Sequence, residues 1–157
     1  MSATTLRLPA RVAQRVHAHL LGAYPEEGCG VLLGRELGAS REVVLAIPSE
    51  NQSADSRANR YVIAPEQVLS AEREGRVLGL DVIGFFHSHP DHPPRPSAFD
   101  LEHAWPYYSY LIVSLERGRV AETRSWRMVE ERTRFEPETV EILPVGDSRE
   151  ASGEQRT

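Results

Sequence analysis

Apolar residues recur along the chain with two different spacings, which predict helices and strands. After Pro9 they recur at helical spacing, so we predict an amphipathic helix that ends between Gly22 and Pro25. Proline is well tolerated at the first position of a helix, and Pro65 is therefore expected to begin a second helix that runs to about Val77. Short apolar runs predict strands at residues 30–33, 43–47, 61–64, 82–87, 108–115, 120–129 and 140–143.

The predicted helices and strands follow one another without regular alternation, which favours an α+β fold. The chain has 157 residues, 40% of them hydrophobic, which fits one globular domain and is too short for two ordinary ones. We expect this domain to span residues 1–143. Residues 144–157 follow the last predicted strand and are expected to form a disordered C-terminal tail.

The charge balance and the cysteine content exclude several classes of function. A net charge of −5 without any basic run argues against a nucleic-acid-binding surface. The first residues have no signal-peptide core and no apolar stretch is long enough to span a membrane, so we expect a cytoplasmic protein. The single cysteine, Cys29, excludes an internal disulfide, and its place at the head of an apolar run favours a buried structural residue.

A candidate metal site lies between residues 84 and 100, where three side chains of the zinc-ligand type stand close together. His87 and His89 are two residues apart at the end of a predicted strand, so both imidazoles project from the same face. Prolines at 93, 94 and 96 exclude a helix from the following loop, and Ser97 is well placed to begin one with Asp100 in its first turn. Two histidines and one carboxylate leave a fourth tetrahedral position for water, which predicts a catalytic zinc.

Each of these residues also has an ordinary structural interpretation. Ser97 can act only as the N-cap of the helix, and Asp100 can serve only to complement the helix dipole. His92 and His103 are rival ligands, because one lies in the loop and the other lies three residues beyond Asp100. We interpret both as solvated residues or as neighbours of the site. A cysteine protease built on Cys29 would leave the His-His-Asp set unexplained.

The same residues resemble the signature of the JAMM metalloproteases of the JAB1/MPN family. In that signature His-x-His-Pro is followed after ten residues by Asp, with Ser three positions before the Asp. This chain has His87, His89, Ser97 and Asp100 at those positions. The family also has an upstream Pro-x-Glu-x-Cys-Gly segment, which residues 25–30 match. The resemblance covers about residues 6–143.

The resemblance implies a site and a fold. The two histidines and the aspartate would hold one catalytic Zn²⁺ per chain. Glu27 would act as the proton acceptor, and Ser97 would help to stabilise the oxyanion. Glu26 is the competing base, because adjacent residues of a strand face opposite ways. The fold implied is a single MPN-like domain whose curved, partly barrel-like sheet is flanked by helices.

The resemblance also implies a substrate class. JAMM enzymes cleave the amide bond after the Gly-Gly tail of ubiquitin-like proteins, and bacterial relatives act on sulfur-carrier proteins of that fold, so a protein with such a tail is the expected partner. One alternative is a non-catalytic MPN scaffold, although such proteins usually lack part of the ligand set. A second is a RadC-like protein associated with DNA repair, which the acidic charge fits less well. A zinc deaminase would need paired cysteines, which this chain lacks.

Overall fold

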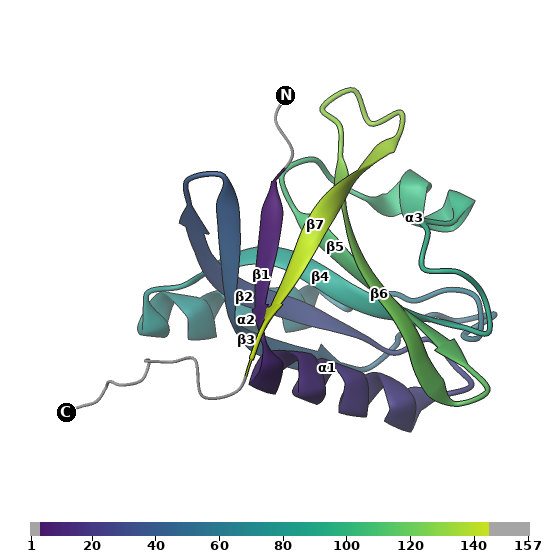
Figure 1. The fold of residues 1–157 in the computed structure, drawn as a ribbon. Helices are drawn as coiled ribbons and strands as arrows, with labels where there is room; N and C mark the ends of the chain where they lie inside the picture. Colours follow the sequence, from purple (N-terminus) through teal and green to yellow (C-terminus); the bar gives the residue numbers. More distant parts are fainter. Residues whose placement is uncertain (1–3, 145–157) are drawn as a thin grey trace.

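The computed structural model describes residues 4–144, in which three helices accompany seven strands (Figure 1). The predicted disordered tail lies, apart from residue 144, outside the described residues. The elements in chain order are β1 (Thr5–Pro9), α1 (Ala10–Ala23), β2 (Cys29–Leu37), β3 (Ser40–Ser49), α2 (Pro65–Leu78), β4 (Asp81–Pro90), α3 (Ala98–His103), β5 (Ser109–Glu116), β6 (Arg119–Met128) and β7 (Phe135–Leu143).

The strands form a closed barrel in the order β1-β3-β2-β4-β5-β6-β7. The barrel closes because β1 pairs in parallel with both β3 and β7. Strands β4 and β5 are also parallel, whereas the remaining neighbours are antiparallel. The predicted α+β fold with a barrel-like sheet is therefore confirmed.

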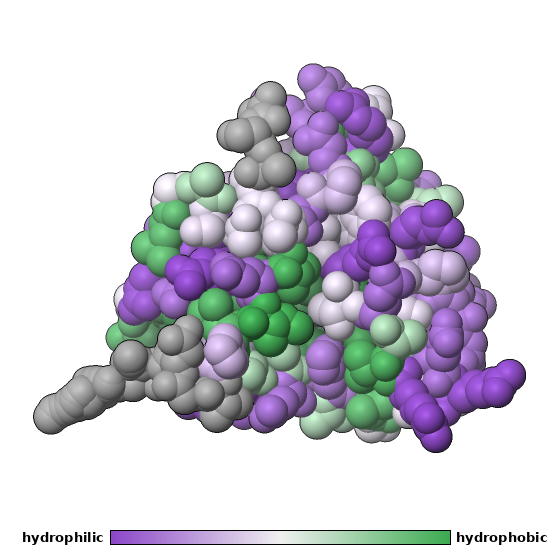
Figure 2. Space-filling model, in the orientation of Figure 1, coloured by the Kyte–Doolittle hydropathy of each residue, from purple (hydrophilic) through white to green (hydrophobic). Residues whose placement is uncertain are grey.

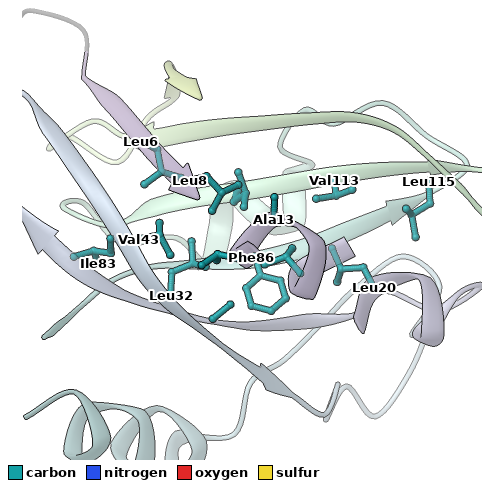
Figure 3. Close-up of a cluster of buried hydrophobic side chains, with 14 residues drawn as sticks. Leu6, Leu8, Ala13, Leu20, Leu32, Val43, Ile83, Phe86, Val113 and Leu115 are labelled. Atoms are coloured by element: carbon teal, nitrogen blue, oxygen red, sulfur yellow. The ribbon is translucent and has the colours of Figure 1, made fainter. Parts of the chain in front are cut away.

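The two neighbouring strands β2 and β4 are covered by side chains on both faces. One face contributes Leu32 and Phe86 to the main core, which also contains the inner face of α1 (Figure 3). The opposite face packs Val31 and Val82 against α2. Because both faces are buried here, residues 29–33 of β2 and residues 82–86 of β4 are continuous apolar runs and do not alternate between apolar and polar residues.

Gly30 is required where β2 crosses the main core. A Cβ atom at this position would collide with the ring of Phe86 and with the carbonyl oxygen of Ile47. Glycine therefore lets β2 approach Phe86 on β4 and the backbone of β3 closely. This close packing fixes the position of β2 beside the strand that carries His87 and His89.

Both helices predicted from the long apolar patterns are confirmed, as is the short helix after Ser97. The prediction of a strand at residues 61–64 is wrong, because these residues form a loop. In this loop the backbone of Val62 forms hydrogen bonds with the side chain of Asn51 and with the backbone of Gln52. The strand β1 was not predicted, although Leu6 and Leu8 alternate inward, and β7 begins five residues earlier than expected at Phe135.

The surface of the barrel mixes polar and apolar side chains. On the face shown in Figure 2, hydrophobic residues form several separate areas among hydrophilic ones. Within residues 4–144, none of the helices has the length and apolar character that crossing a membrane requires.

Candidate metal centre

His87 and His89 project from the same side of β4 into the interior. Their side chains are almost completely buried, and their Nε2 atoms lie 3.2 Å apart. The strand holds them there because β4 lies between β2 and β5 and bonds to both. The convergence expected from their two-residue spacing is present in the structure.

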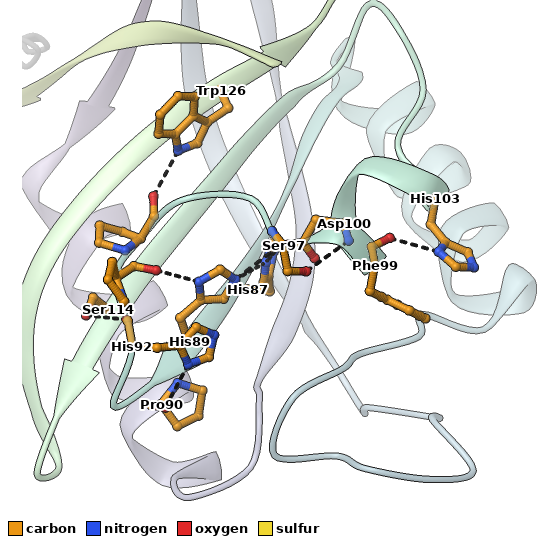
Figure 4. Close-up of polar contacts among 12 residues, drawn as sticks. His87, His89, Pro90, His92, Ser97, Phe99, Asp100, His103, Ser114 and Trp126 are labelled. Carbon is orange, nitrogen blue, oxygen red and sulfur yellow. Dashed lines mark hydrogen bonds and ion pairs between the residues drawn. The ribbon is translucent and has the colours of Figure 1, made fainter. Parts of the chain in front are cut away.

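The carboxylate of Asp100 reaches the histidines because the first turn of α3 fixes its position. Ser97 caps this helix: its Oγ accepts a hydrogen bond of 3.0 Å from the backbone N–H of Asp100. In return, Asp100 Oδ2 accepts a bond of 2.9 Å from the backbone N–H of Ser97. The same Oδ2 lies 3.3 Å from Nε2 of His87 and 3.2 Å from Nε2 of His89 (Figure 4).

The three converging atoms have the spacing of metal ligands. A tetrahedral zinc ion with bonds of about 2.0–2.1 Å has ligand atoms about 3.3–3.4 Å apart, and the three separations here are 3.2–3.3 Å. The Nδ1 atom of His89 lies 2.7 Å from the carbonyl oxygen of Pro93. Since a carbonyl only accepts, Nδ1 carries the proton and Nε2 presents a lone pair to the cluster.

A cation between these three atoms would remove an electrostatic conflict. Two acceptor atoms at 3.2 Å, Nε2 of His89 and Oδ2 of Asp100, repel each other unless a proton or a metal ion lies between them. Without a metal ion, protons on the histidine Nε2 atoms fill this place: burial raises the pKa of Asp100, but the charge of His87 and the hydrogen bonds from both histidines and from Ser97 hold it well below its usual range. Asp100 is therefore a carboxylate, and the donor set fits a divalent cation such as zinc.

Glu27 is the unpaired acid beside this cluster. It is 2% exposed, and its Oε1 has no hydrogen-bond partner. Burial raises its pKa to about 8, with His89 lowering the value and Asp100 raising it. The backbone of Glu27 is held on both sides, since its N–H donates to Arg57 O at 2.7 Å and its carbonyl accepts from Asn51 Nδ2 at 3.0 Å.

Two depressions of different character adjoin residues of the site. One is an apolar pocket of about 230 Å³, with His87 and Asp100 in its wall. Its aromatic lining is Tyr61, Phe85, Phe99, Trp105, Tyr110 and Phe135. The other is a polar groove of about 620 Å³ that includes Glu26, Glu27, Glu50 and Asn51. The first depression therefore adjoins two of the ligands, and the second adjoins the acid.

The two histidines that we considered as rival ligands have different positions. His92 stacks on His89, with ring centroids 4.1 Å apart, and offers a ligand atom within 4.8 Å of those of Glu27 and His89. His103 is exposed, stacks on Phe99 and bonds to its carbonyl (Figure 4).

Sequence reasoning missed three groups that support the site. Tyr61 stacks on His87 with centroids 4.3 Å apart, Asn51 holds the backbone of Glu27, and Pro93 fixes the tautomer of His89. The apolar run at 61–64 indicated burial but not this contact. Asn51 and Pro93 act through loop geometry, which has no periodic pattern to reveal it.

Comparison with known proteins finds relatives over most of the length of the chain. The sequence profile of the family described as prokaryotic homologs of the JAB domain matches residues 9–129. A desampylase from Haloferax volcanii is 39% identical over 119 residues, which are 73% of this chain and 84% of the relative. A probable TtuB-protein conjugate cleaving protease from Thermus thermophilus is 34% identical over 114 residues, which are 73% of either chain. A solution structure of a Desulfitobacterium hafniense protein matches with a TM-score of 0.77 and 32% identity, over 88% of this chain and 93% of that one.

Proposed function

Because the chain belongs to the prokaryotic homologs of the JAB domain, we propose that it is a zinc-dependent peptidase that cleaves conjugates of a ubiquitin-like or sulfur-carrier protein. The bond cleaved is the amide after the C-terminal Gly-Gly of that protein. The observation that carries the proposal is the tetrahedral spacing of the two histidines and Asp100 beside an unpaired, buried Glu27. Relatives named for cleaving such conjugates support the substrate class.

His87, His89 and Asp100 are the residues that would hold the ion. When bound, zinc would polarise the scissile carbonyl and lower the pKa of a water molecule. The residues of the chain supply the proton transfers. Glu27 accepts the proton that the attacking water loses, and it donates this proton to the amine nitrogen as the carbon–nitrogen bond breaks.

Ser97 is the candidate for stabilising the oxyanion. Its Oγ lone pair accepts the N–H of Asp100, which leaves its own O–H proton free to donate. A donor aimed at the oxygen that gains charge in the transition state contributes about 3 kcal/mol, or roughly a hundredfold in rate. The capping bond and this donation use different parts of the hydroxyl, so Ser97 can do both.

The competing base, Glu26, faces solvent, whereas Glu27 is buried beside His89. This difference supports Glu27 in the proton-transfer role. Because Glu26 and Glu27 are adjacent and identical in type, their glutamine variants form a matched pair for testing this role.

The test uses a linear fusion in which a ubiquitin-fold protein ending in Gly-Gly precedes a reporter. Cleavage should stop with a chelator and return when zinc is restored. Glu27→Gln should bind one zinc per chain and lose about a hundredfold or more in kcat, because it cannot accept a proton. Glu26→Gln should stay close to the wild type. A wild-type protein that cleaves the fusion without any metal would refute the proposal.

A further inference from the structure

We propose that the protein has a second, inhibitory site for a divalent transition-metal ion, formed by Glu27 and His92 beside the catalytic centre. The inference rests on the proposed function, because it concerns the regulation of the same site. Glu27, His89 and His92 each offer a ligand atom, and these atoms all lie within 4.8 Å of one another. Of these three residues, the catalytic ligand set uses only His89.

His92 is held as a ligand would be held. Its Nδ1 lies 2.9 Å from the carbonyl oxygen of Pro90, so Nδ1 carries the proton and Nε2 presents a lone pair. Its ring stacks on that of His89 with an interplanar angle of 18° (Figure 4). Its carbonyl accepts a hydrogen bond of 2.9 Å from Ser114 Oγ on β5. The ring of His92 is therefore held in place, and its Nε2 lone pair is available to a metal ion.

The turn that carries His92 is also fixed to the barrel. Asp91, the residue before it, donates its N–H to Leu115 O at 2.6 Å. The side chain of Asp91 accepts from the Tyr24 hydroxyl at 2.6 Å and from the Arg117 N–H at 2.8 Å. These bonds join the turn to β5, to the turn after β5 and to the end of α1, so His92 stays beside Glu27.

Glu27 supplies the second ligand. Its Oε1 is buried without a hydrogen-bond partner, and the residue lines the polar groove that also includes Glu26 and Glu50. Because Nε2 of His89 already serves the first ion, the second ion has one carboxylate oxygen and one imidazole from the protein, completed by water. A site with two protein ligands is weaker than one with three, so it fills after the catalytic site.

The charges around the site permit a second cation. The first ion carries two positive charges, and the carboxylates of Asp100 and Glu27 together balance them, while the imidazoles are neutral. An approaching dication therefore does not meet a net positive cluster. An imidazole ligand favours zinc and related transition metals over Mg²⁺, which prefers oxygen donors and retains its water. Occupation of this site would engage the carboxylate that the reaction needs as a base.

The experiment measures bound zinc and cleavage on the same samples. Protein loaded with one zinc per chain is dialysed against increasing buffered free zinc, and the bound metal and the rate of fusion cleavage are determined at each concentration. We expect a second equivalent to bind, with a rate loss of about a hundredfold or more at saturation. Equal concentrations of Mg²⁺ should produce neither effect.

Two variants of His92 and one control decide the assignment. His92→Asn should bind a single equivalent and escape inhibition by excess zinc. His92→Phe, which preserves the stacking on His89 and removes both nitrogens, should behave in the same way. His103→Asn replaces the exposed histidine that also bonds to a backbone carbonyl, and it should keep the second equivalent and the inhibition.

Three results would overturn the inference. In the first, the wild type binds one equivalent of zinc at every zinc concentration. In the second, excess zinc inhibits the His92 variants as strongly as the wild type. In the third, the His92 variants lose the first equivalent of zinc, which would mean that His92 only holds His89 in position. Binding is measured independently of turnover. A protein that binds two equivalents and cleaves no fusion would therefore refute the proposed function and leave the second site intact.

Discussion

At the scale of single residues, the site depends on side chains whose hydrogen bonds are incomplete or shared. Glu27 has a buried oxygen without a hydrogen-bond partner. His89 donates a hydrogen bond from Nδ1 to the carbonyl oxygen of Pro93 and presents Nε2 to the ligand cluster. A buried, unpaired carboxylate destabilises a fold because burial disfavours its charged form, so such a residue is expected mainly where function requires it. Glu27 is therefore a residue where stability and activity conflict.

This conflict predicts a pH-dependent gain in stability for Glu27→Gln in metal-free protein. Burial raises the pKa of Glu27 from 4.5 to about 8, so between these values the folded state keeps a proton that the unfolded state has lost. The stability of the wild type therefore falls as the pH rises from about 5 to 8. Glutamine removes this loss, and we expect the variant to exceed the wild type by between about 1 and 5 kcal/mol at pH 8.

Urea unfolding with a chelator, at pH values from 4 to 9, measures this difference. At pH 4 the carboxyl is protonated in both states, so the two proteins should have similar stability. Glu26→Gln changes an exposed carboxylate and should follow the wild type at every pH. A constant difference between Glu27→Gln and the wild type across the range would contradict the assignment of burial as the cause.

At the scale of elements, the sequence predicted the parts of the site that depend on regular spacing. The two-residue step along β4 and the three-residue step at the start of α3 both follow from element geometry, and both are present. The contact of Tyr61 with His87 could not be predicted in this way, since residues 61–64 form a loop positioned by Asn51 and Gln52. β1 was missed because its five residues run directly into α1, so the inward alternation is too short to stand apart from the helical pattern.

The start of α3 predicts different effects of two substitutions at Ser97. Ser97→Ala removes both the helix cap and the hydroxyl proton, so it should lose about 1 kcal/mol of stability and roughly a hundredfold in rate. Ser97→Gly should lose the same rate but only a few tenths of a kcal/mol, since glycine is tolerated at this position. Both should retain zinc, because the ligand atoms are unchanged. Thermal unfolding, metal content and kcat separate these effects, and a Ser97→Gly variant with normal kcat would leave Ser97 as a cap alone.

At the scale of the whole molecule, the pairing of β2 with β4 and the loops around them bring distant parts of the chain to one site. The ligands come from β4 and α3, the acid comes from the segment before β2, and the loop at residues 51–61 holds the acid and one ligand. The apolar pocket has two of the ligands in its wall and the polar groove includes the acid, so both depressions adjoin groups of the site. Residues 9–129, which match the family, include all of these groups.

This arrangement predicts which part of the substrate controls cleavage. The Nε2 atoms of His87 and His89 belong to residues that are 1% and 0% exposed, so the scissile carbonyl must approach closely to reach an ion that they hold. A side chain on either of the last two residues of the tail would keep the carbonyl away from it, whereas glycine would not. Replacing either glycine by leucine in the fusion should abolish cleavage, while changing the residue after the bond should have a smaller effect. Cleavage is followed by mass spectrometry, with an unfolded protein that lacks Gly-Gly as the control. Digestion of that control at the rate of the folded fusion would make the enzyme a general peptidase.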